Sequence, residues 1–243
     1  FIYSGCHNLN ATELYAAISP DNDDHLYVAT ATGGIFRSYD AGANWTPIFD
    51  EVTKPSIGDI AIAPSNSQRI YAGTGEANGS ATDGAYFGDG IYRSDNGGDT
   101  WTNVGLPESN HIGRIVVDPN NPDRVFAAAT GQLYGKNVER GIYRTTNGGV
   151  GWAILNGGLP TGGLDRILLG VTPDNPDIIY ALIAKSDAGF YGFYKSSDAG
   201  DTWATQFDCP DPITGCNILG RKTDGTSEGG QSWYDMSLAI SPN

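Results

Sequence analysis

The sequence predicts an all-β protein, a β-propeller of four-stranded antiparallel blades, and three observations lead to this prediction. An octamer first seen as SYDAGANW returns three times, and its tryptophans follow one another at intervals of 56, 51 and 51 residues. Short alternating apolar segments precede each copy. The 243 residues include 34 Gly, 13 Pro, 13 Tyr and five Trp, which suits many turns and short strands. Four short strands in a repeat of about 50 residues are typical of a propeller blade.

Each unit follows the same order of elements. It begins with an apolar alternation that ends in proline, as in LYAAISP (to Pro20) and IGDIAIAP (to Pro64), which indicates an innermost strand. An Asn/Asp-rich turn, a second strand such as HLYVAT, a variable loop and a third strand such as GIFRS follow. The octamer then leads to a fourth strand that begins at its tryptophan. The predicted blades cover approximately residues 11–50, 57–106, 111–157 and 164–208, and a fifth begins at 233.

The octamer is interpreted as a stiff turn between the third and fourth strands. Asp or Asn at its third position can accept backbone N–H bonds, and glycine at its fifth position can take a positive φ without a Cβ clash. Tryptophan at its eighth position offers a large apolar face and an N–H donor. We therefore expect a structural role for Ser38, Asp40, Gly42, Trp45, Ser94, Asn96, Gly98, Trp101, Thr145, Asn147, Gly149, Trp152, Ser196, Asp198, Gly200 and Trp203.

These octamers resemble the Asp-box, or BNR repeat, with the pattern S-x-D-x-G-x-x-W. The stretches GTGEANG (73–79), HIGRIVVDPNNPD (111–123) and GQSWYDMSLAISP (230–242) also resemble secreted bacterial sortilin-like exoproteins with glycosyl-hydrolase-like BNR repeats. The resemblance implies a propeller and an extracellular or cell-surface bacterial protein. Because Asp-boxes lie away from the active faces of such proteins, it implies a fold rather than a function.

The composition disfavours several kinds of partner. The chain has 28 acidic and 14 basic side chains and a net charge of −14, which is unfavourable for binding a nucleic-acid backbone. It has no apolar run of about 18 residues, so no membrane span is predicted. Its three histidines are scattered and fit no zinc site. No cofactor is expected, although the acidic turn DNDD (21–24) offers oxygen ligands of the kind that Ca²⁺ prefers.

Two classes of function fit a propeller of this kind. Glycoside hydrolysis needs two carboxylates that face one cleft. The resemblance implies that xyloglucan-cleaving relatives carry an Asp in a T-D-x-G-G segment of the first blade, but the matching stretch TATGG (30–34) has Ala31 there. A methyl group cannot transfer a proton. The sequence therefore favours a non-catalytic recognition or assembly module for a protein or glycan, with a glycoside hydrolase as the alternative.

A sialidase is less compatible with the sequence, because that chemistry needs an arginine triad. Arg37, Arg93 and Arg144 all stand at one place before an octamer, and this recurrence indicates a structural role.

The loops between the second and third strands are the candidate contact surface, because they share one face when blades stack normally. The longest of these loops covers residues 75–90. The alternative is that the loops are solvated and contact only one another. The candidate ligand-binding residues are Glu76, Asp83, Asp89, Tyr134, Phe190, Tyr191, Tyr234 and Asp235.

The innermost strands place a second group of residues around the central channel. Asp and Arg that alternate at these positions are expected to form ion pairs between blades. Counting back five residues from each terminal proline, and including close neighbours, selects Tyr15, Asp59, Arg114, Arg166, Asp235 and Ser237.

The cysteines and the last residues leave alternatives open. Cys209 and Cys216 bracket PDPITG and either close a small disulfide loop or remain free thiols, while Cys6 has no evident partner. The alternating segment 234–242 is interpreted as a fifth innermost strand beside the fourth blade, with further blades to follow. The alternative is that this segment pairs with the first blade and closes a small ring.

Overall fold

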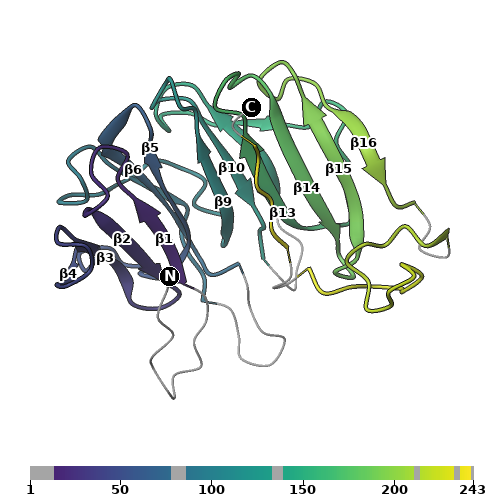
Figure 1. Cartoon of the computed structure of the whole chain (residues 1–243), viewed down its shortest axis with the longest axis horizontal. Helices are drawn as coiled ribbons and strands as arrows, with labels where there is room; N and C mark the ends of the chain where they lie inside the picture. Colours follow the sequence, from purple (N-terminus) through teal and green to yellow (C-terminus); the bar gives the residue numbers. More distant parts are fainter. Residues whose placement is uncertain (1–13, 78–85, 133–138, 211–213, 233–235, 242–243) are drawn as a thin grey trace.

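A computed structural model describes residues 14–77, 86–132, 139–210, 214–232 and 236–241. These residues form four separate four-stranded antiparallel sheets, which stand side by side in chain order as the blades of a fan (Figure 1). The predicted all-β fold with four-stranded propeller blades is confirmed. Within the described ranges there is no α-helix, and hence no helix that could cross a membrane.

The sixteen strands of the described residues fall into four equivalent groups. Blade one contains β1 (Leu14–Ile18), β2 (Leu26–Thr30), β3 (Gly34–Ser38) and β4 (Thr46–Pro47). Blade two contains β5 (Ile57–Ala63), β6 (Asn66–Thr74), β7 (Ile91–Ser94) and β8 (Thr102–Asn103). Blade three contains β9 (Ile112–Val117), β10 (Val125–Ala129), β11 (Gly141–Thr145) and β12 (Ala153–Leu155). Blade four contains β13 (Leu164–Val171), β14 (Ile179–Lys185), β15 (Phe190–Ser196) and β16 (Ala204–Asp208).

The core of the protein lies between neighbouring blades. The first strands β1, β5, β9 and β13 lie next to one another along the inner side of the fan. All five residues of β10 are buried, because a blade covers each face of its sheet, whereas β2 of blade one buries every second residue. Tyr71 is fully buried and packs with Ile112 and Ile115 of the next blade. Burial of such side chains stabilises each interface by about 1.5–3 kcal/mol per residue.

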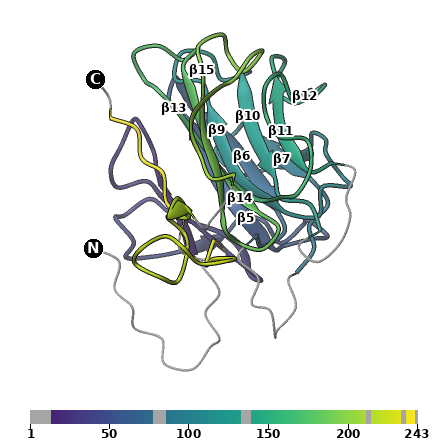
Figure 2. The same ribbon diagram turned by 90° about the vertical axis from the view of Figure 1, so that its right-hand side faces the viewer.

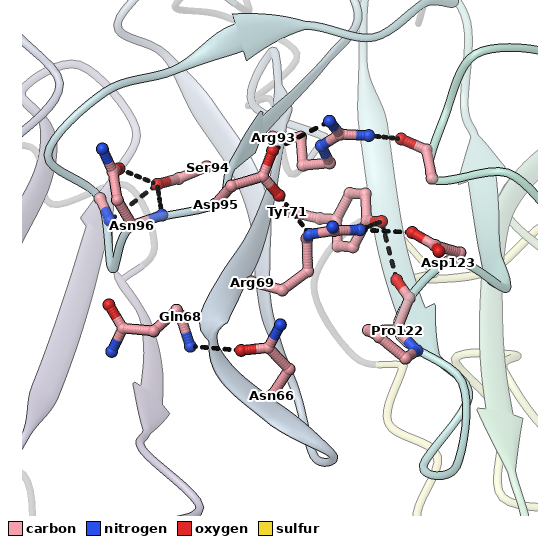
Figure 3. Close-up of polar contacts among 12 residues, drawn as sticks. Asn66, Gln68, Arg69, Tyr71, Arg93, Ser94, Asp95, Asn96, Pro122 and Asp123 are labelled. Atoms are coloured by element: carbon pink, nitrogen blue, oxygen red, sulfur yellow. Dashed lines mark hydrogen bonds and ion pairs between the residues drawn. The ribbon is translucent and has the colours of Figure 1, made fainter.

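Each octamer forms the turn between the third and fourth strands of its blade. In blade two, Ser94 Oγ accepts the N–H of Gly98 at 2.8 Å and Asn96 Oδ1 accepts the N–H of Thr100 at 3.0 Å; Figure 3 shows Ser94 beside Asn96. The same two bonds recur in the other three octamers. Gly98 has a φ of 96°, which a residue without a Cβ adopts readily.

Side chains from one blade also hold the octamer of the next. The arginine before each of the first three octamers donates a hydrogen bond to a backbone carbonyl inside the following octamer, a contact that we call the interblade clamp. The clamps join Arg37 to Gly97 at 2.7 Å, Arg93 to Gly148 at 2.7 Å and Arg144 to Ala199 at 2.8 Å. The structural role expected of these three arginines is confirmed. In the opposite direction, the indole of Trp101 donates to the carbonyl of Ile48 at 2.8 Å.

A second layer of contacts supports the clamp between blades two and three (Figure 3). Arg69 forms an ion pair with Asp95 of its own blade and another with Asp123 of the next, the latter at 2.5 Å. The hydroxyl of Tyr71 donates to the carbonyl of Pro122 at 2.8 Å. Through Asp123 and Pro122, these bonds join blade two to blade three.

The C-terminal segment 236–241 forms no β-strand and runs along β13 (Figure 2, yellow). Leu238 packs with Leu168, and Ile240 lies next to Gly170. The alternate residues of β13, such as Leu169, pack on blade three. Residues 236–241 thus lie beside the fourth blade on its face away from blade three, while the rest of the expected fifth strand, 233–235 and Pro242, lies outside the described residues.

Candidate recognition site on the loop face

The two ends of the blades carry different structures. At one end, every octamer donates a backbone N–H to a carbonyl in the turn between the first and second strands of its own blade or at the start of the second strand. At the other end, the loops after the second strands lie against the connections between blades. Gly75 N–H donates to Ser56 O at 2.8 Å, and Ser186 N–H donates to Gly163 O at 2.9 Å. We call this end the loop face; it forms the lower edge of the molecule in Figure 1.

The predicted residue Glu76 lies inside the loop face rather than on its surface. It is 1% exposed, and its backbone N–H donates to Ser56 Oγ at 3.0 Å. Gly75, directly before it, has a φ of 85°, and a Cβ at this position would lie 1.9 Å from the carbonyl oxygen of Asn110. This tight approach draws Glu76 under the loop. In the structure its carboxylate is therefore covered.

The predicted residue Asp89 holds the other end of the same loop. Its backbone N–H donates to Thr74 Oγ1 at 2.9 Å, and its Oδ2 accepts the hydroxyl proton of Tyr92 at 3.0 Å. Burial raises the pKa of Tyr92, so this hydroxyl remains a donor at neutral pH. The bonds of Asp89 explain how the end of the loop is fixed to β6 and β7.

Of the remaining predicted contact residues, Tyr191 is half-buried on β15 and Phe190 beside it is buried. The phenyl ring of Phe190 stacks on Phe207 with 5.5 Å between ring centroids, so it serves the packing of blade four. Four predicted residues lie outside the described residues, namely Asp83, Tyr134, Tyr234 and Asp235.

The inner strands surround a central hollow of about 230 Å³. Tyr15, Arg114 and Ser237, three of the four positions counted back from a proline, line it, and so does the neighbouring residue Arg166. Arg166 is 6% exposed, and its Nη1 lies 3.4 Å from the carbonyl of Ser232.

Asp59 joins two inner strands. Its Oδ1 lies 3.8 Å from Arg114 Nη1 of the next blade, which confirms the expected ion pair between blades. Its Oδ2 accepts the N–H of Ile115 at 2.6 Å. Burial raises the pKa of Asp59 to about 6, because desolvation of the carboxylate outweighs the opposing effects of the Arg114 charge and the backbone donors.

A larger hollow of about 390 Å³ opens on the loop face of blade four, and we call it the blade-four hollow. Its walls come from three parts of the chain: the connection before β13, the β14–β15 turn with the start of β15, and the end of β16. The residues that matter most for its chemistry are Gly163, Lys185, Asp187, Tyr191, Asp208 and Cys209.

The blade-four hollow has a fixed frame. Cys209 and Cys216 form a disulfide, so the structure contains the bridge rather than the two free thiols. Lys185 Nζ donates to the carbonyl of Cys209 at 2.6 Å and lies 5.9 Å from the centroid of the Tyr191 ring. Asn217 is 3% exposed and supports the turn from behind by accepting the N–H of Phe190 at 2.9 Å.

Sequence reasoning identified only Tyr191 among the polar and aromatic residues of this hollow. Lys185 and Asp187 stand in the same loop, in AKSDAGFYG, but nothing in that stretch distinguishes them from ordinary turn residues. Asp208 is more than 15 residues farther along the chain, on another strand. Only the pairing of β15 with β16 brings it to the same wall. In the sequence, the one indication for Asp208 is that it directly precedes Cys209, a cysteine of the possible disulfide loop.

Ala31, which replaces the carboxylate expected in xyloglucan-cleaving relatives, follows β2 on the loop face. It is 3% exposed and offers neither an acid nor a base. Among the described residues no cluster of three or more His, Cys, Asp or Glu side chains could hold a metal ion.

Comparison with known proteins places this arrangement in a family. The model of the Sortilin-Vps10 family, described as sortilin, neurotensin receptor 3, matches residues 33–158, which is more than half of the chain. The chain belongs to the Sortilin-Vps10 family. The sortilin-like resemblance noted from the sequence is thereby confirmed.

Other relatives of this Sortilin-Vps10 chain are distant. A xyloglucanase from Paenibacillus sp is 29% identical over 145 residues, covering 54% of this chain and 13% of that protein. The crystal structure of a GH74 enzyme from Niastella koreensis matches with a TM-score of 0.62 at 21% identity, covering 81% of this chain and 29% of that one.

An auxiliary nutrient binding protein from Bacteroides thetaiotaomicron matches with a TM-score of 0.54 at 10% identity, covering 80% of this chain and 41% of that one. At such identities the solved structures show a shared fold alone. The chain spans 13% to 24% of the length of the curated relatives it matches.

Proposed function

We propose that this chain is a non-catalytic recognition or assembly module of a secreted or cell-surface protein, and that its loop face binds a protein or glycan ligand. The observation that carries the proposal is the blade-four hollow. It combines an aromatic ring, hydrogen-bonding side chains and a disulfide-bonded wall on the exposed end of the blades. Concave sites with a few convergent polar groups are where proteins usually bind small ligands or parts of larger ones.

Two further points support binding without catalysis. Ala31 stands where a carboxylate is expected for xyloglucan cleavage, and Glu76 is covered by its own loop. The relatives include xyloglucanases and a nutrient binding protein, so the fold by itself is compatible with either class. The choice between an enzyme and a binding protein therefore depends on the side chains of this chain.

One observation favours glycoside hydrolysis as the second candidate function. Asp187 and Asp208 line the same hollow, and hydrolysis uses a pair of carboxyl groups. A general acid is usually a carboxyl in an apolar, desolvated pocket. Both of these side chains are exposed to solvent, which argues for binding rather than proton transfer.

The test combines a hydrolysis screen with a binding screen of the purified chain. Xyloglucan and other polysaccharides are incubated with the protein and new reducing ends are measured, while a glycan array and a peptide library report binding. We expect binding and no hydrolysis. Reducing ends that are released by the wild type, and are lost in Asp187→Asn or Asp208→Asn, would overturn the proposal in favour of the hydrolase.

The disulfide supports the proposed location outside the cytoplasm. Cys209 and Cys216 form a bridge with a sequence separation of 7, and such bridges persist mainly in oxidising compartments. Localisation by fractionation and thiol labelling tests this part of the proposal: the two cysteines should resist alkylation before reduction.

A further inference from the structure

We infer that the blade-four hollow is a subsite for one uncharged sugar ring, a conclusion that rests on the proposed recognition function and names its ligand class. The volume of about 390 Å³ lies in the range of small-ligand pockets, about 300–1,000 Å³. The shape of the hollow, its free hydrogen-bonding groups and its charge each restrict the class of ligand that it can bind.

The hollow presents an aromatic surface that is already ordered. Tyr191 is half-buried on β15, and its backbone carbonyl accepts the N–H of Cys209 at 3.1 Å. The disulfide from Cys209 fixes that wall, and Lys185 bridges it to the ring. A ring held in this way loses little conformational freedom on binding. Its apolar surface suits the C–H groups of a sugar, and its hydroxyl suits the polar edge.

Several polar groups around the hollow have no hydrogen-bond partner within the described part of the protein. They are the carboxylate of Asp208, the hydroxyl of Ser186 and the hydroxyl of Tyr191. Asp187 Oδ1 accepts one backbone N–H, from Gly189 at 2.9 Å, and its other oxygen faces no described donor. Carboxylates accept from hydroxyl groups and hydroxyls both donate and accept, which matches a ligand with many hydroxyls.

Among the described residues, open space lies over Gly162 and Gly163 of the hollow. A Cβ added to either glycine would have no described atom within 4 Å. A flat ring could therefore approach the peptide groups there while its other side contacts Tyr191.

The charges and the free oxygens of the hollow disfavour anionic and apolar ligands. Two carboxylates and one ammonium leave the hollow with an excess of one negative charge, and the chain carries −14 in all, so an anionic sugar or peptide is repelled. An apolar ligand would desolvate the carboxylates without replacing their hydrogen bonds, which is costly. An uncharged polyol satisfies all of these groups.

The experiment measures binding of matched oligosaccharides to the whole chain by isothermal titration calorimetry. The uncharged probes are a xyloglucan heptasaccharide, cellohexaose and mannohexaose, and the anionic probe is hexameric oligogalacturonate. We expect at least one uncharged probe to bind, and the anionic probe to bind at least tenfold more weakly. Tyr191→Ala should weaken binding at least tenfold, whereas Tyr191→Phe should stay within about threefold because it keeps the ring.

Tyr86→Ala is the matched control, because Tyr86 is a 57% exposed tyrosine of the loop face outside the hollow. It should bind as the wild type does, and near-UV circular dichroism should show that every variant is folded. The inference is overturned if no uncharged probe binds, if the anionic probe binds equally well, or if Tyr191→Ala has no effect. Peptide binding in the absence of sugar binding would refute the sugar subsite and leave the recognition module standing, whereas hydrolysis of a bound probe would refute the non-catalytic function alone.

Discussion

The substitution Asp59→Asn is expected to stabilise the protein at about pH 8 and to change its stability little near pH 4. Asp59 is 3% exposed between the inner strands of blades two and three. An asparagine keeps an oxygen that can accept the N–H of Ile115, now 2.6 Å from the carboxylate, and it removes the buried charge. The change therefore isolates the cost of ionisation at this position.

The magnitude follows from the pKa of Asp59, which burial raises from 3.8 to about 6. Because the folded-state pKa exceeds the unfolded-state value, the folded protein binds more protons than the unfolded chain between these two pH values. The contribution of Asp59 to stability is thus fully present below about pH 4 and is lost as the pH rises through about 6. The two pKa values differ by an amount equivalent to about 3 kcal/mol, which is the largest gain expected for the variant above pH 6.

The assay is urea denaturation followed by tryptophan fluorescence, at several pH values from about 4 to about 8. The quantity compared is the difference in unfolding free energy between Asp59→Asn and the wild type, which should grow with pH and level off above about 6. Asp50→Asn, at an exposed carboxylate, serves as the control and should show little change. A variant less stable than the wild type at pH 8, or a difference that does not depend on pH, would refute the reasoning.

Three further substitutions test other parts of the structure. Ser94→Ala removes the hydroxyl that accepts the N–H of Gly98 and should lower the unfolding free energy by about 2 kcal/mol, measured by urea denaturation; an unchanged midpoint would contradict the proposed turn geometry. Cys216→Ser opens a loop with a sequence separation of 7 and should cost about 2 kcal/mol, with no additional effect of reductant on its melting temperature. Gly75→Ala should cost about 2 kcal/mol or more, because a Cβ there would lie 1.9 Å from a backbone oxygen; increased proteolysis of the loop face would report it, and wild-type resistance would count against it.

The fold could be predicted from the sequence because the same local chemistry is repeated in each blade. Each octamer determines its own turn geometry, since the side chains of Ser94 and Asn96 form their hydrogen bonds to residues of the same octamer. The alternation before each proline fixed which side of an inner strand faces the axis. For this reason Tyr15 and Arg114, chosen by counting alone, do line the central hollow.

The candidate site was less accessible to sequence reasoning, because it depends on contacts between distant segments. Glu76 looked like a loop carboxylate, yet the approach of Gly75 to Asn110 buries it. Whether a loop residue is exposed depends on the connection packed against it, and local pattern carries no information about that contact. Asp208 reaches Tyr191 only through the register of β15 with β16 and the bridge from Cys209.

The interblade clamp has a consequence for how such a chain grows. Blades two and three each carry an arginine donor for the next blade and, in their octamer, a backbone acceptor for the preceding blade, as Arg93 and Gly97 show for blade two. A duplicated blade of this kind therefore carries both the arginine donor and the carbonyl acceptor of the interblade clamp. Because the acceptor is a main-chain oxygen, no substitution removes it. Gene segments that encode whole blades can be gained or lost at little cost to the remaining contacts, so lineages can vary the number of blades while each pair of neighbours stays compatible.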